Sequence, residues 1–521
     1  MQKISFNSLH QTAAEYLAAA ILGLFPDTFL LGGQGTARYF YYDFIFSFPL
    51  EHETLKIIEE RMVQLYRQNN PLVLKEMVPS NAVAFFNSIR QKHLAQQMKE
   101  LEGGLAQLCQ LGHFVDYCPY PFIQSWPFKP FFTLFEILPG KRTRIIGAVF
   151  SDKNELKAFT KNLPALQRVN HSHLCTEMQL MMPLNENRWM WLPQGETLRT
   201  ILLKFWRQEL VKQKFQFLSS PHASPGKKTP EQLVFSHHQA CFELTGQARL
   251  AEILYLSNKK HEGSANALLE SAEYFTDRFT FFCDDEIFLQ TCISSLQSIL
   301  KMPRILGFEL QIVLGSSTAK GHRSKEKRKE IYQVLRKALE LSSLEYIEEI
   351  DYRPDCEAWI EIRIEDALGR LWNGPFIGVP SLSTGKGKQA FCSMFGAMER
   401  FVALLLEKTE GVLPVWLAPE QVRLVVVNKE GAIFARTLHD KLVSEGIRAS
   451  IDEQPIELRA SLHQTVREKV PYVICVGEKD VTASTFPVRK WGAKQEERMT
   501  LEALCEVIKT VNWEWDSELQ N

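Results

Sequence analysis

The chain is organised around a stretch near residue 400 in which apolar residues recur at helical spacing. Met398, Phe401, Val402 and Leu405 lie three or four positions apart, so they share one face of a helix. The pattern ends before Gly411, and a glycine that is soon followed by a proline is typical of a helix end. This stretch therefore predicts a buried helix of about three turns.

The pattern before this helix predicts a mixture of helices and strands. Helices are expected at 11–25, 51–68, 154–169 and 196–214. Alternating or aromatic runs predict strands at 39–48, 131–138, 144–150, 305–312 and 358–364. A turn-rich segment at 222–230 and a basic run at 320–329 lie between these elements, and we expect both at the surface.

Strands and helices alternate in the C-terminal part of the chain. Strands are expected at 422–427, 449–451 and 472–476, and helices at 432–445, 456–469 and 501–510. Because a strand that is followed by a helix usually pairs in parallel with the next strand, this segment predicts an α/β unit with a largely parallel sheet.

Length and composition are those of an ordinary globular protein. The 521 residues are 45% apolar and 23% charged, which suits about two to four domains. Sixty basic and sixty-one acidic residues leave no global basic bias, so nucleic-acid binding would need a local patch. The ten cysteines include no Cys-x-x-Cys pair, and the apolar stretch near the N-terminus is interrupted by Glu15. We therefore expect a cytoplasmic protein with reduced thiols and no membrane contact.

Two neighbouring motifs resemble a known family. Gly-x-x-Glu-Arg-Phe starts at Gly396 and contains Glu399 and Arg400, and Pro-x-Trp-Leu-Ala-Pro runs from Pro414 to Pro419. Together they resemble the third class II motif of threonyl-tRNA synthetases and its passage into the anticodon-binding domain. By themselves, Glu399 and Arg400 would also fit a simple ion pair at a helix start.

The resemblance covers essentially the whole chain and implies an α+β multidomain protein. An editing-like domain would occupy 1–165, and a class II catalytic-like core with an antiparallel sheet would occupy 166–412. An α/β anticodon-binding-like domain would occupy 413–521. From the resemblance we expect a chain that lacks the small ubiquitin-like domain that usually precedes the editing domain.

The resemblance also implies that the residues used for ATP are replaced. In the family, motif 2 supplies an arginine for the α-phosphate and a glutamate for adenine, and the corresponding positions hold Asn258 and Lys260. A second arginine position holds Ala272. Arg400 of motif 3 remains, but one guanidinium does not clamp a triphosphate. The resemblance therefore implies doubtful ATP binding, no aminoacylation and no cofactor.

The zinc site of the family is replaced as well. One cysteine and two histidines normally hold the metal, and the corresponding positions hold Thr229, Thr280 and Phe391. None of these side chains is a plausible zinc ligand, since zinc sites use Cys, His, Asp or Glu. We therefore expect a chain without zinc.

The editing site keeps only some of its residues. In the family, a His-x-x-x-His pair on a helix faces a cysteine and another histidine. The corresponding positions here hold Gln11, Glu15, Cys118 and Phe122. Asp116 and Cys118 match the family. A lone cysteine is more often a small buried side chain than a nucleophile, so we expect no editing activity.

The resemblance places anticodon contacts at Asp480 and Arg489, with Lys490 and Trp491 adjacent, in a turn before the final helix. These side chains offer a carboxylate, two cations and a stacking ring to an unstacked base. A family asparagine falls at Pro455, so we expect weak tRNA binding. Alternatively, Arg489 merely pairs with Asp480 in a solvated turn.

The predicted helix at 196–214 resembles motif 1, which builds the dimer interface of the family. Leu198, Leu202, Phe205 and Trp206 lie along one of its sides. We expect this apolar side to be covered by a second chain, because large exposed apolar patches are rare. The expected partner is a second copy or a genuine synthetase.

Three functions remain open at this point. The first is a degenerate threonyl-tRNA synthetase paralogue that acts in translation through tRNA or protein binding. The second is a divergent ATP-dependent ligase for threonine or another amino acid, with a rebuilt site that could use His237, His238 or His261. The third is a subunit that pairs with a genuine synthetase and regulates it.

Overall fold

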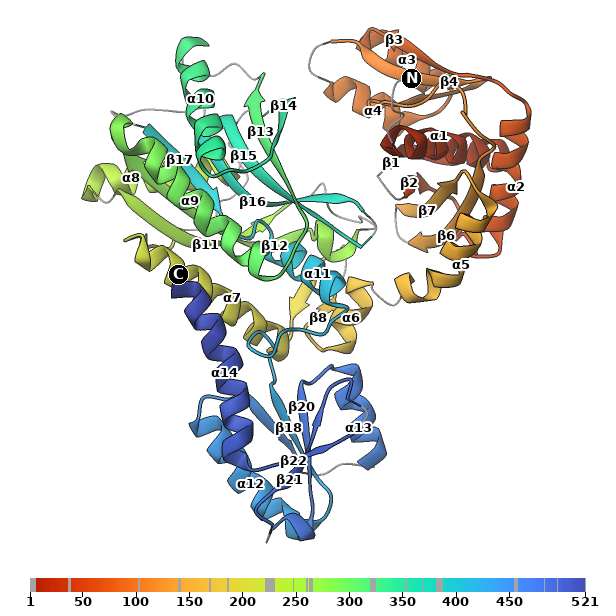
Figure 1. The fold of residues 1–521 in the computed structure, drawn as a ribbon. Helices are drawn as coiled ribbons and strands as arrows, with labels where there is room; N and C mark the ends of the chain where they lie inside the picture. The colour runs from red at the N-terminus through yellow and green to blue at the C-terminus, as the bar shows by residue number, and fades with distance from the viewer. Residues whose placement is uncertain are drawn as a thin grey trace. The chain divides into compact units, whose positions relative to one another are not determined.

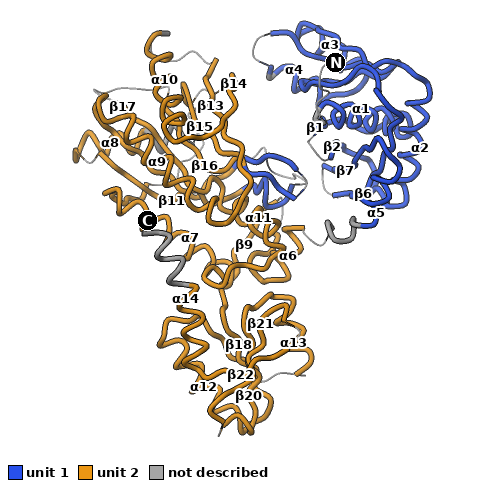
Figure 2. Tube along the Cα trace, in the orientation of Figure 1, with its two compact units in different colours: residues 1–168, 258–272, 364–372 blue, residues 169–257, 273–363, 373–521 orange. Residues whose placement is uncertain are grey.

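A computed structural model describes most of the chain as two compact units (Figures 1 and 2). Unit 1 comprises Met1–Arg168, Asn258–Ala272 and Ile364–Trp372, and unit 2 comprises Val169–Ser257, Glu273–Arg363 and Asn373–Asn521. None of the helices in the described residues is long and apolar enough to cross a bilayer. The described residues are 6–35, 39–101, 104–138, 142–167, 170–184, 187–220, 230–246, 248–258, 261, 266–318, 325–351, 353, 355–367, 369–380, 388–453, 458–481, 483–493 and 495–520.

Unit 1 contains a four-stranded sheet in the order β1-β2-β7-β6 and a three-stranded sheet in the order β3-β4-β5. All of these pairings are antiparallel. The strands are β1 (Phe29–Gly35), β2 (Phe40–Ile45), β3 (Leu72–Met77), β4 (Ala106–Leu111), β5 (Phe114–Tyr117), β6 (Phe131–Leu138) and β7 (Thr143–Phe150). The helices are α1 (Phe6–Leu24), α2 (Thr54–Arg67), α3 (Pro79–Ser88), α4 (Lys92–Glu100) and α5 (Lys153–Gln167).

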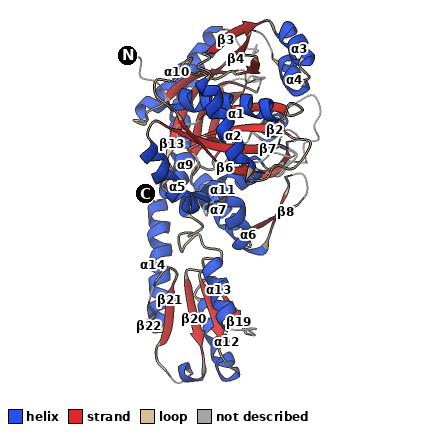
Figure 3. Ribbon diagram, turned by 90° about the vertical axis from the view of Figure 1, so that its right-hand side faces the viewer, coloured by secondary structure: helices blue, strands red, loops and turns tan. Residues whose placement is uncertain are grey.

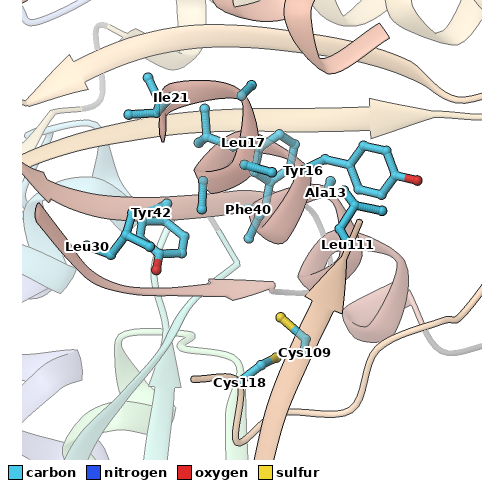
Figure 4. Packing of buried hydrophobic residues seen from close by; sticks show 14 of the residues in the cluster. Ala13, Tyr16, Leu17, Ile21, Leu30, Phe40, Tyr42, Cys109, Leu111 and Cys118 are labelled. Carbon is cyan, nitrogen blue, oxygen red and sulfur yellow. The ribbon is translucent and has the colours of Figure 1, made fainter. Parts of the chain in front are cut away.

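Helix α1 lies in the main core of unit 1 (Figure 4). Ala13 and Ala14 are wholly buried, and their small side chains allow the helix backbone to approach the sheet closely. Leu17 of α1 and Phe40 and Tyr42 of β2 are buried in the same cluster. The alternation of buried and partly buried positions along β2 places Phe40, Tyr42 and Phe44 on the face toward this core.

A buried polar network joins the three segments of unit 1. Arg144 donates to both carboxylate oxygens of Asp43, at 2.7 and 2.8 Å. The side-chain oxygen of Asn266 accepts from Arg144 and, at 3.1 Å, from Arg370. Arg370 is also paired with Asp366 at 2.6 Å. Because each buried guanidinium has a carboxylate partner, the network fixes the two later segments to the N-terminal one without leaving a charge unpaired.

The larger part of unit 2 is built on an eight-stranded sheet in the order β10-β11-β12-β17-β16-β15-β13-β14. The β11-β12, β12-β17 and β16-β17 pairs are antiparallel, and the β10-β11 and β13-β14 pairs are parallel. The strands are β10 (Gln216–Phe217), β11 (Arg249–Ser257), β12 (Glu273–Cys283), β13 (Leu310–Ser317), β14 (Ile347–Asp351), β15 (Cys356–Glu365), β16 (Leu371–Pro380) and β17 (Lys388–Ser393).

Helices and a small hairpin complete this part of unit 2. The helices are α6 (His171–Glu177), α7 (Pro193–Lys212), α8 (Pro230–Thr245), α9 (Asp285–Ile305), α10 (Lys325–Leu341) and α11 (Met398–Thr409). The hairpin consists of β8 (Met181–Pro183) and β9 (Trp189–Trp191). Helix α11 is the helix that the apolar spacing near residue 400 predicts, and its apolar face is wholly buried.

The C-terminal part of unit 2 is a five-stranded sheet in the order β19-β18-β20-β21-β22 (Figure 3). Strand β18 pairs in parallel with β19 and β20, as predicted, whereas β21 pairs antiparallel with β20 and β22. The strands are β18 (Val422–Val426), β19 (Ala449–Asp452), β20 (Tyr472–Val476), β21 (Phe486–Lys490) and β22 (Glu497–Met499). The helices are α12 (Lys429–Ser444), α13 (Leu458–Arg467) and α14 (Leu501–Gln520).

The predicted strand at 305–312 is wrong in its first half. Helix α9 continues through Ile305, and β13 begins only at Leu310. Between them Gly307 has a φ of 67°, the left-handed conformation that commonly follows a helix. A short apolar run does not distinguish a buried helix end from a strand, and here the helix extends into it.

Candidate functional site

A buried carboxylate shapes the turn that leads into α11. Asp277 on β12 accepts a hydrogen bond from the hydroxyl of Ser393 at 2.8 Å. It also accepts from the backbone N–H groups of Met394 and Phe395, at 2.7 and 3.0 Å. Gly396 follows with a φ of 68°, a conformation that favours glycine. Asp277 thus fixes the backbone immediately before the Glu-Arg pair.

Glu399 is buried in the first turn of α11. Its carboxylate accepts hydrogen bonds from the indole N–H of Trp191 at 2.8 Å and from the backbone N–H of Phe275 at 3.0 Å. Burial raises the pKa of Glu399 to about 7. Arg400 is half-buried and donates to the carbonyl of Asn373 at 3.1 Å. The two charged residues therefore tie α11 to strands β9, β12 and β16.

Replacing Glu399 by glutamine is expected to flatten the pH dependence of stability. The pKa of Glu399 is raised in the folded chain relative to its ordinary value of 4.5. Its contribution to the free energy of unfolding is therefore complete below pH 4.5 and is lost as the pH rises through about 7. A shift of this size corresponds to roughly 3 kcal/mol. Urea unfolding measured across this pH range should show wild type losing stability more steeply than Glu399→Gln. Parallel profiles would contradict the role of this carboxyl group.

The positions that correspond to motif 2 lie in unit 1. The backbone N–H of Asn258 donates to the carbonyl of Ala272 at 2.8 Å. The Asn258 amide nitrogen lies 3.2 Å from Nε2 of His261, and Nδ1 of this ring lies 3.1 Å from the Ser271 carbonyl. Lys260 lies outside the described residues. Position 258 therefore holds an amide and position 272 a buried methyl group, at the two positions where the resemblance predicts that the family has guanidinium groups.

Thr280, at one family zinc position, belongs to a closed polar network. Its hydroxyl lies 2.8 Å from Nδ1 of His238, and Nε2 of this ring lies 3.0 Å from a carboxylate oxygen of Glu252. Glu252 also accepts from the backbone N–H and the hydroxyl of Ser220. The hydrogen bond from His238 holds the pKa of Glu252 below its ordinary value despite burial. His238 is wholly buried.

Phe391 fills a second zinc position with apolar bulk. It lies opposite Thr280 in the β12-β17 pairing and opposite Gly378 in the β16-β17 pairing. It is buried and clusters with Trp359. A Cβ atom on Gly378 would approach its ring to 2.8 Å, which shows how closely the ring fits. The remaining position, Thr229, lies outside the described residues.

The positions of the family's editing histidines are occupied by a buried hydrogen-bonded pair. The Gln11 amide donates to Glu15 at 2.8 Å and accepts from the backbone N–H of Gly35 at 2.9 Å. The Sγ atom of Cys118 lies 3.5 Å from the Gln11 amide nitrogen. Phe122 is half-buried and packs against the core of unit 1. The site therefore has no imidazole at these positions to activate a water.

Asp116, which matches the family, is wholly buried beside these residues. It accepts a hydrogen bond from the hydroxyl of Tyr42. Burial raises the pKa of Asp116 and of Glu15 well above their ordinary values. The neighbouring Cys109 thiol is the main cause of a lowered pKa at Cys118. The sequence alone did not identify Cys109, because only the pairing of β4 with β5 brings it here.

The predicted anticodon residues lie at β21 and near it rather than in one turn. Arg489 and Lys490 are exposed at the end of β21, which corrects their predicted position in a turn. Asp480 lies in a short 3₁₀ turn, and its ion pair, at 4.0 Å, is with Arg498 rather than with Arg489. Trp491 donates its indole N–H to a backbone carbonyl of α13 at 3.1 Å. The two exposed cations are therefore available to a ligand.

The predicted apolar side of α7 is already covered within the chain. Leu198, Leu202 and Phe205 are wholly buried, and Trp206 is 2% exposed. The argument that these side chains require a second chain is therefore wrong, because tertiary contacts remove them from water. Dimer formation itself stays a prediction and would need a different surface.

Comparison with known proteins agrees with the fold and the motifs. The family "Anticodon binding domain" matches residues 421–511. A threonine–tRNA ligase of Lawsonia intracellularis is 25% identical, over 96% of this chain and 87% of that protein. One of Dehalococcoides mccartyi is 26% identical, over 94% of this chain and 93% of that protein.

Two solved structures have related folds. The RNA binding domain of threonyl-tRNA synthetase from Cryptosporidium parvum has a TM-score of 0.58 at 19% identity and covers 66% of this chain and 98% of that one. The prolyl-tRNA synthetase of Cryptosporidium parvum, complexed with L-proline and AMP, has a TM-score of 0.51 at 10% identity, over 67% and 76% of the two chains. The fold is therefore that of the class II aminoacyl-tRNA synthetases. Within that class, the chain is a threonyl-tRNA synthetase-like protein with a C-terminal anticodon-binding domain, as the motifs predicted.

Proposed function

We propose that this protein is a degenerate threonyl-tRNA synthetase-like protein that neither charges nor edits tRNA and that acts in translation by binding tRNA. The observation that carries the proposal is Phe391, whose buried ring lies opposite Thr280. A phenyl ring and a hydroxyl already bonded to His238 offer no zinc site for a threonine substrate. The proposed role requires neither zinc nor ATP.

The contrast between scaffold and site residues supports this role. Asp277 and Glu399 keep their buried hydrogen bonds around α11, whereas positions 258 and 272 have lost their guanidinium groups. We propose an editing-like domain at 1–165, a catalytic-like domain at 166–412 and an anticodon-binding-like domain at 413–521. The proposed location is the cytoplasm, where tRNA is used.

Replacing Arg489 by alanine is expected to weaken tRNA binding. Its guanidinium is exposed beside Lys490 at the end of β21, where it can meet a phosphate or a base edge. Loss of one phosphate contact should reduce the salt slope of binding by roughly one unit, and loss of a base contact should cost about 1–3 kcal/mol. Filter-binding titrations at two salt concentrations measure both effects.

A matched control for this test is Arg436→Ala. Arg436 is an exposed arginine of the same domain, but its guanidinium is paired with Glu453 at 2.6 Å. Its removal should leave tRNA affinity nearly unchanged. Absence of tRNA binding by wild type even at low salt would rule out the tRNA role and leave binding to a protein partner as the proposed function.

The second candidate function is a divergent ligase with a rebuilt site. The observation that favours it is His238, which lies between the carboxylate of Glu252 and the hydroxyl of Thr280. Such an arrangement can activate a hydroxyl group. All three side chains are buried, however, so no substrate reaches them in this structure. ATP–pyrophosphate exchange with each amino acid in turn separates this candidate from the first.

The third candidate function is a subunit that pairs with a genuine synthetase. Because the apolar side of α7 is buried within the chain, the support for a homodimer or heterodimer is the resemblance to the family. We expect light scattering at micromolar concentration to give the mass of a pair, or a synthetase to co-purify from cells. A monomer without such a partner would contradict pairing.

A further inference from the structure

Two cysteines of unit 1 lie on the same face of the β4-β5 hairpin. Cys109 on β4 is paired with Asp116 on β5. Cys118 lies two residues beyond Asp116, and its backbone N–H donates to the carbonyl of Gln107 at 3.0 Å. Because side chains alternate along a strand, residues two positions apart point to the same face. The hairpin therefore directs both thiols toward one side, and Figure 4 shows their sulfur atoms next to each other.

Helix α1 brings a carboxylate to the same point. The Cys109 thiol donates to a Glu15 carboxylate oxygen at 3.1 Å. The ligand atoms of Glu15, Cys109 and Cys118 all lie within 4.8 Å of one another. In a tetrahedral zinc site with Zn–S bonds near 2.3 Å, two sulfur ligands lie about 3.8 Å apart. A small contraction would therefore bring the three atoms around one ion.

The cluster is buried in the core of unit 1. Glu15, Cys109 and Cys118 are at most 1% exposed, and Asp116 is wholly buried. A bound cation would compensate the charge of thiolate and carboxylate ligands, which is costly to bury unpaired.

We propose that Glu15, Cys109 and Cys118 bind a thiophilic divalent metal ion of the zinc type. Two thiolates and a carboxylate are ligands that zinc uses in proteins, and they leave one position of a tetrahedral site open. Binding displaces the protons of the two thiols and of the carboxyl group into solvent. This site is distinct from the family's zinc position, and it replaces the expectation of a chain without zinc, which was argued from that position alone. It does not depend on the proposed tRNA role.

Glu15 favours a metal over a disulfide at this pair of cysteines. A disulfide between Cys109 and Cys118 would consume both thiols and remove the hydrogen bond that Cys109 donates to Glu15 at 3.1 Å. A dication instead uses the carboxylate as a third ligand and compensates its charge. A metal therefore gives the acidic side chain beside the two sulfurs a role as ligand that a disulfide would not give it.

Titration of the metal-free, reduced full-length chain with Co²⁺ under anaerobic conditions tests this proposal. We expect about one Co²⁺ per chain with thiolate-to-cobalt charge-transfer absorption, and displacement of Co²⁺ by Zn²⁺. Cys109→Ser and Cys118→Ser should each abolish the charge-transfer band or weaken binding at least about tenfold, and Glu15→Gln should weaken it similarly. Cys175→Ser, which removes an equally buried thiol in unit 2, should leave binding unchanged.

The experiment distinguishes loss of metal binding from loss of folding. Glu15→Gln keeps the size of the side chain and an oxygen that Cys109 can bond, so circular dichroism should match wild type while cobalt affinity falls. Absence of the charge-transfer band in reduced wild type would overturn the proposal. It would equally be overturned by a band that persists in both cysteine variants, or by a chain that binds no metal and forms only a Cys109–Cys118 disulfide on oxidation.

Discussion

Threonine-dependent ATP–pyrophosphate exchange by the purified chain is expected to be at least about a hundredfold slower than exchange by an intact threonyl-tRNA synthetase. Charge builds on the phosphates as an adenylate forms, and removal of one preorganised donor typically costs about 10²–10³ in rate. Here the matching positions hold Asn258, whose amide lies against His261, and the buried methyl group of Ala272. Neither side chain carries a positive charge, so the deficit should appear in the chemical step.

The control for this prediction is an intact threonyl-tRNA synthetase assayed under the same conditions. Adding zinc should not raise the exchange rate, because Thr280 and Phe391 provide no ligands in the catalytic-like domain. A rate within roughly tenfold of the control would contradict the prediction, since that difference is smaller than the loss of a single donor. Exchange that depends on another amino acid would instead favour the divergent ligase.

Replacing Asp277 by alanine is expected to destabilise the chain by about 3–5 kcal/mol. The carboxylate accepts from the backbone N–H groups of Met394 and Phe395 and from the hydroxyl of Ser393. Met394 and Phe395 are at most 1% exposed, so water cannot replace the lost acceptor. Thermal or urea unfolding, followed by a probe in unit 2, measures the loss.

Two further variants make this prediction specific. Asp277→Asn keeps one oxygen acceptor and should lose less stability than the alanine variant. Asp440→Ala removes an aspartate whose side chain is 81% exposed and should change stability by less than about 0.5 kcal/mol. If Asp277→Ala unfolds at the same urea concentration as wild type, the buried carboxylate does not hold the turn before α11.

Elements with a strong local signal could be predicted from the sequence. The apolar spacing of Met398, Phe401 and Leu405 predicts α11, and β20 is found at the predicted residues. Strands β21 and β22 were missed because they are short and carry charged or proline residues, such as Arg489 and Pro487, that obscure the alternation. Short strands of this kind are defined by their neighbours in the sheet rather than by their own pattern.

The sequence by itself determined that the chain carries motifs that resemble those of the threonyl-tRNA synthetases. The same resemblance predicts that charged and metal-binding side chains are replaced at positions such as Asn258 and Phe391. These conclusions depend on residue identity along a local stretch, which a sequence contains in full. Only the tertiary structure decided that His238 meets Thr280, that the side of α7 is covered within the chain, and that Cys109 lies beside Glu15. The last two residues are 94 positions apart, and contacts of this length depend on strand register and helix packing, which no local pattern encodes.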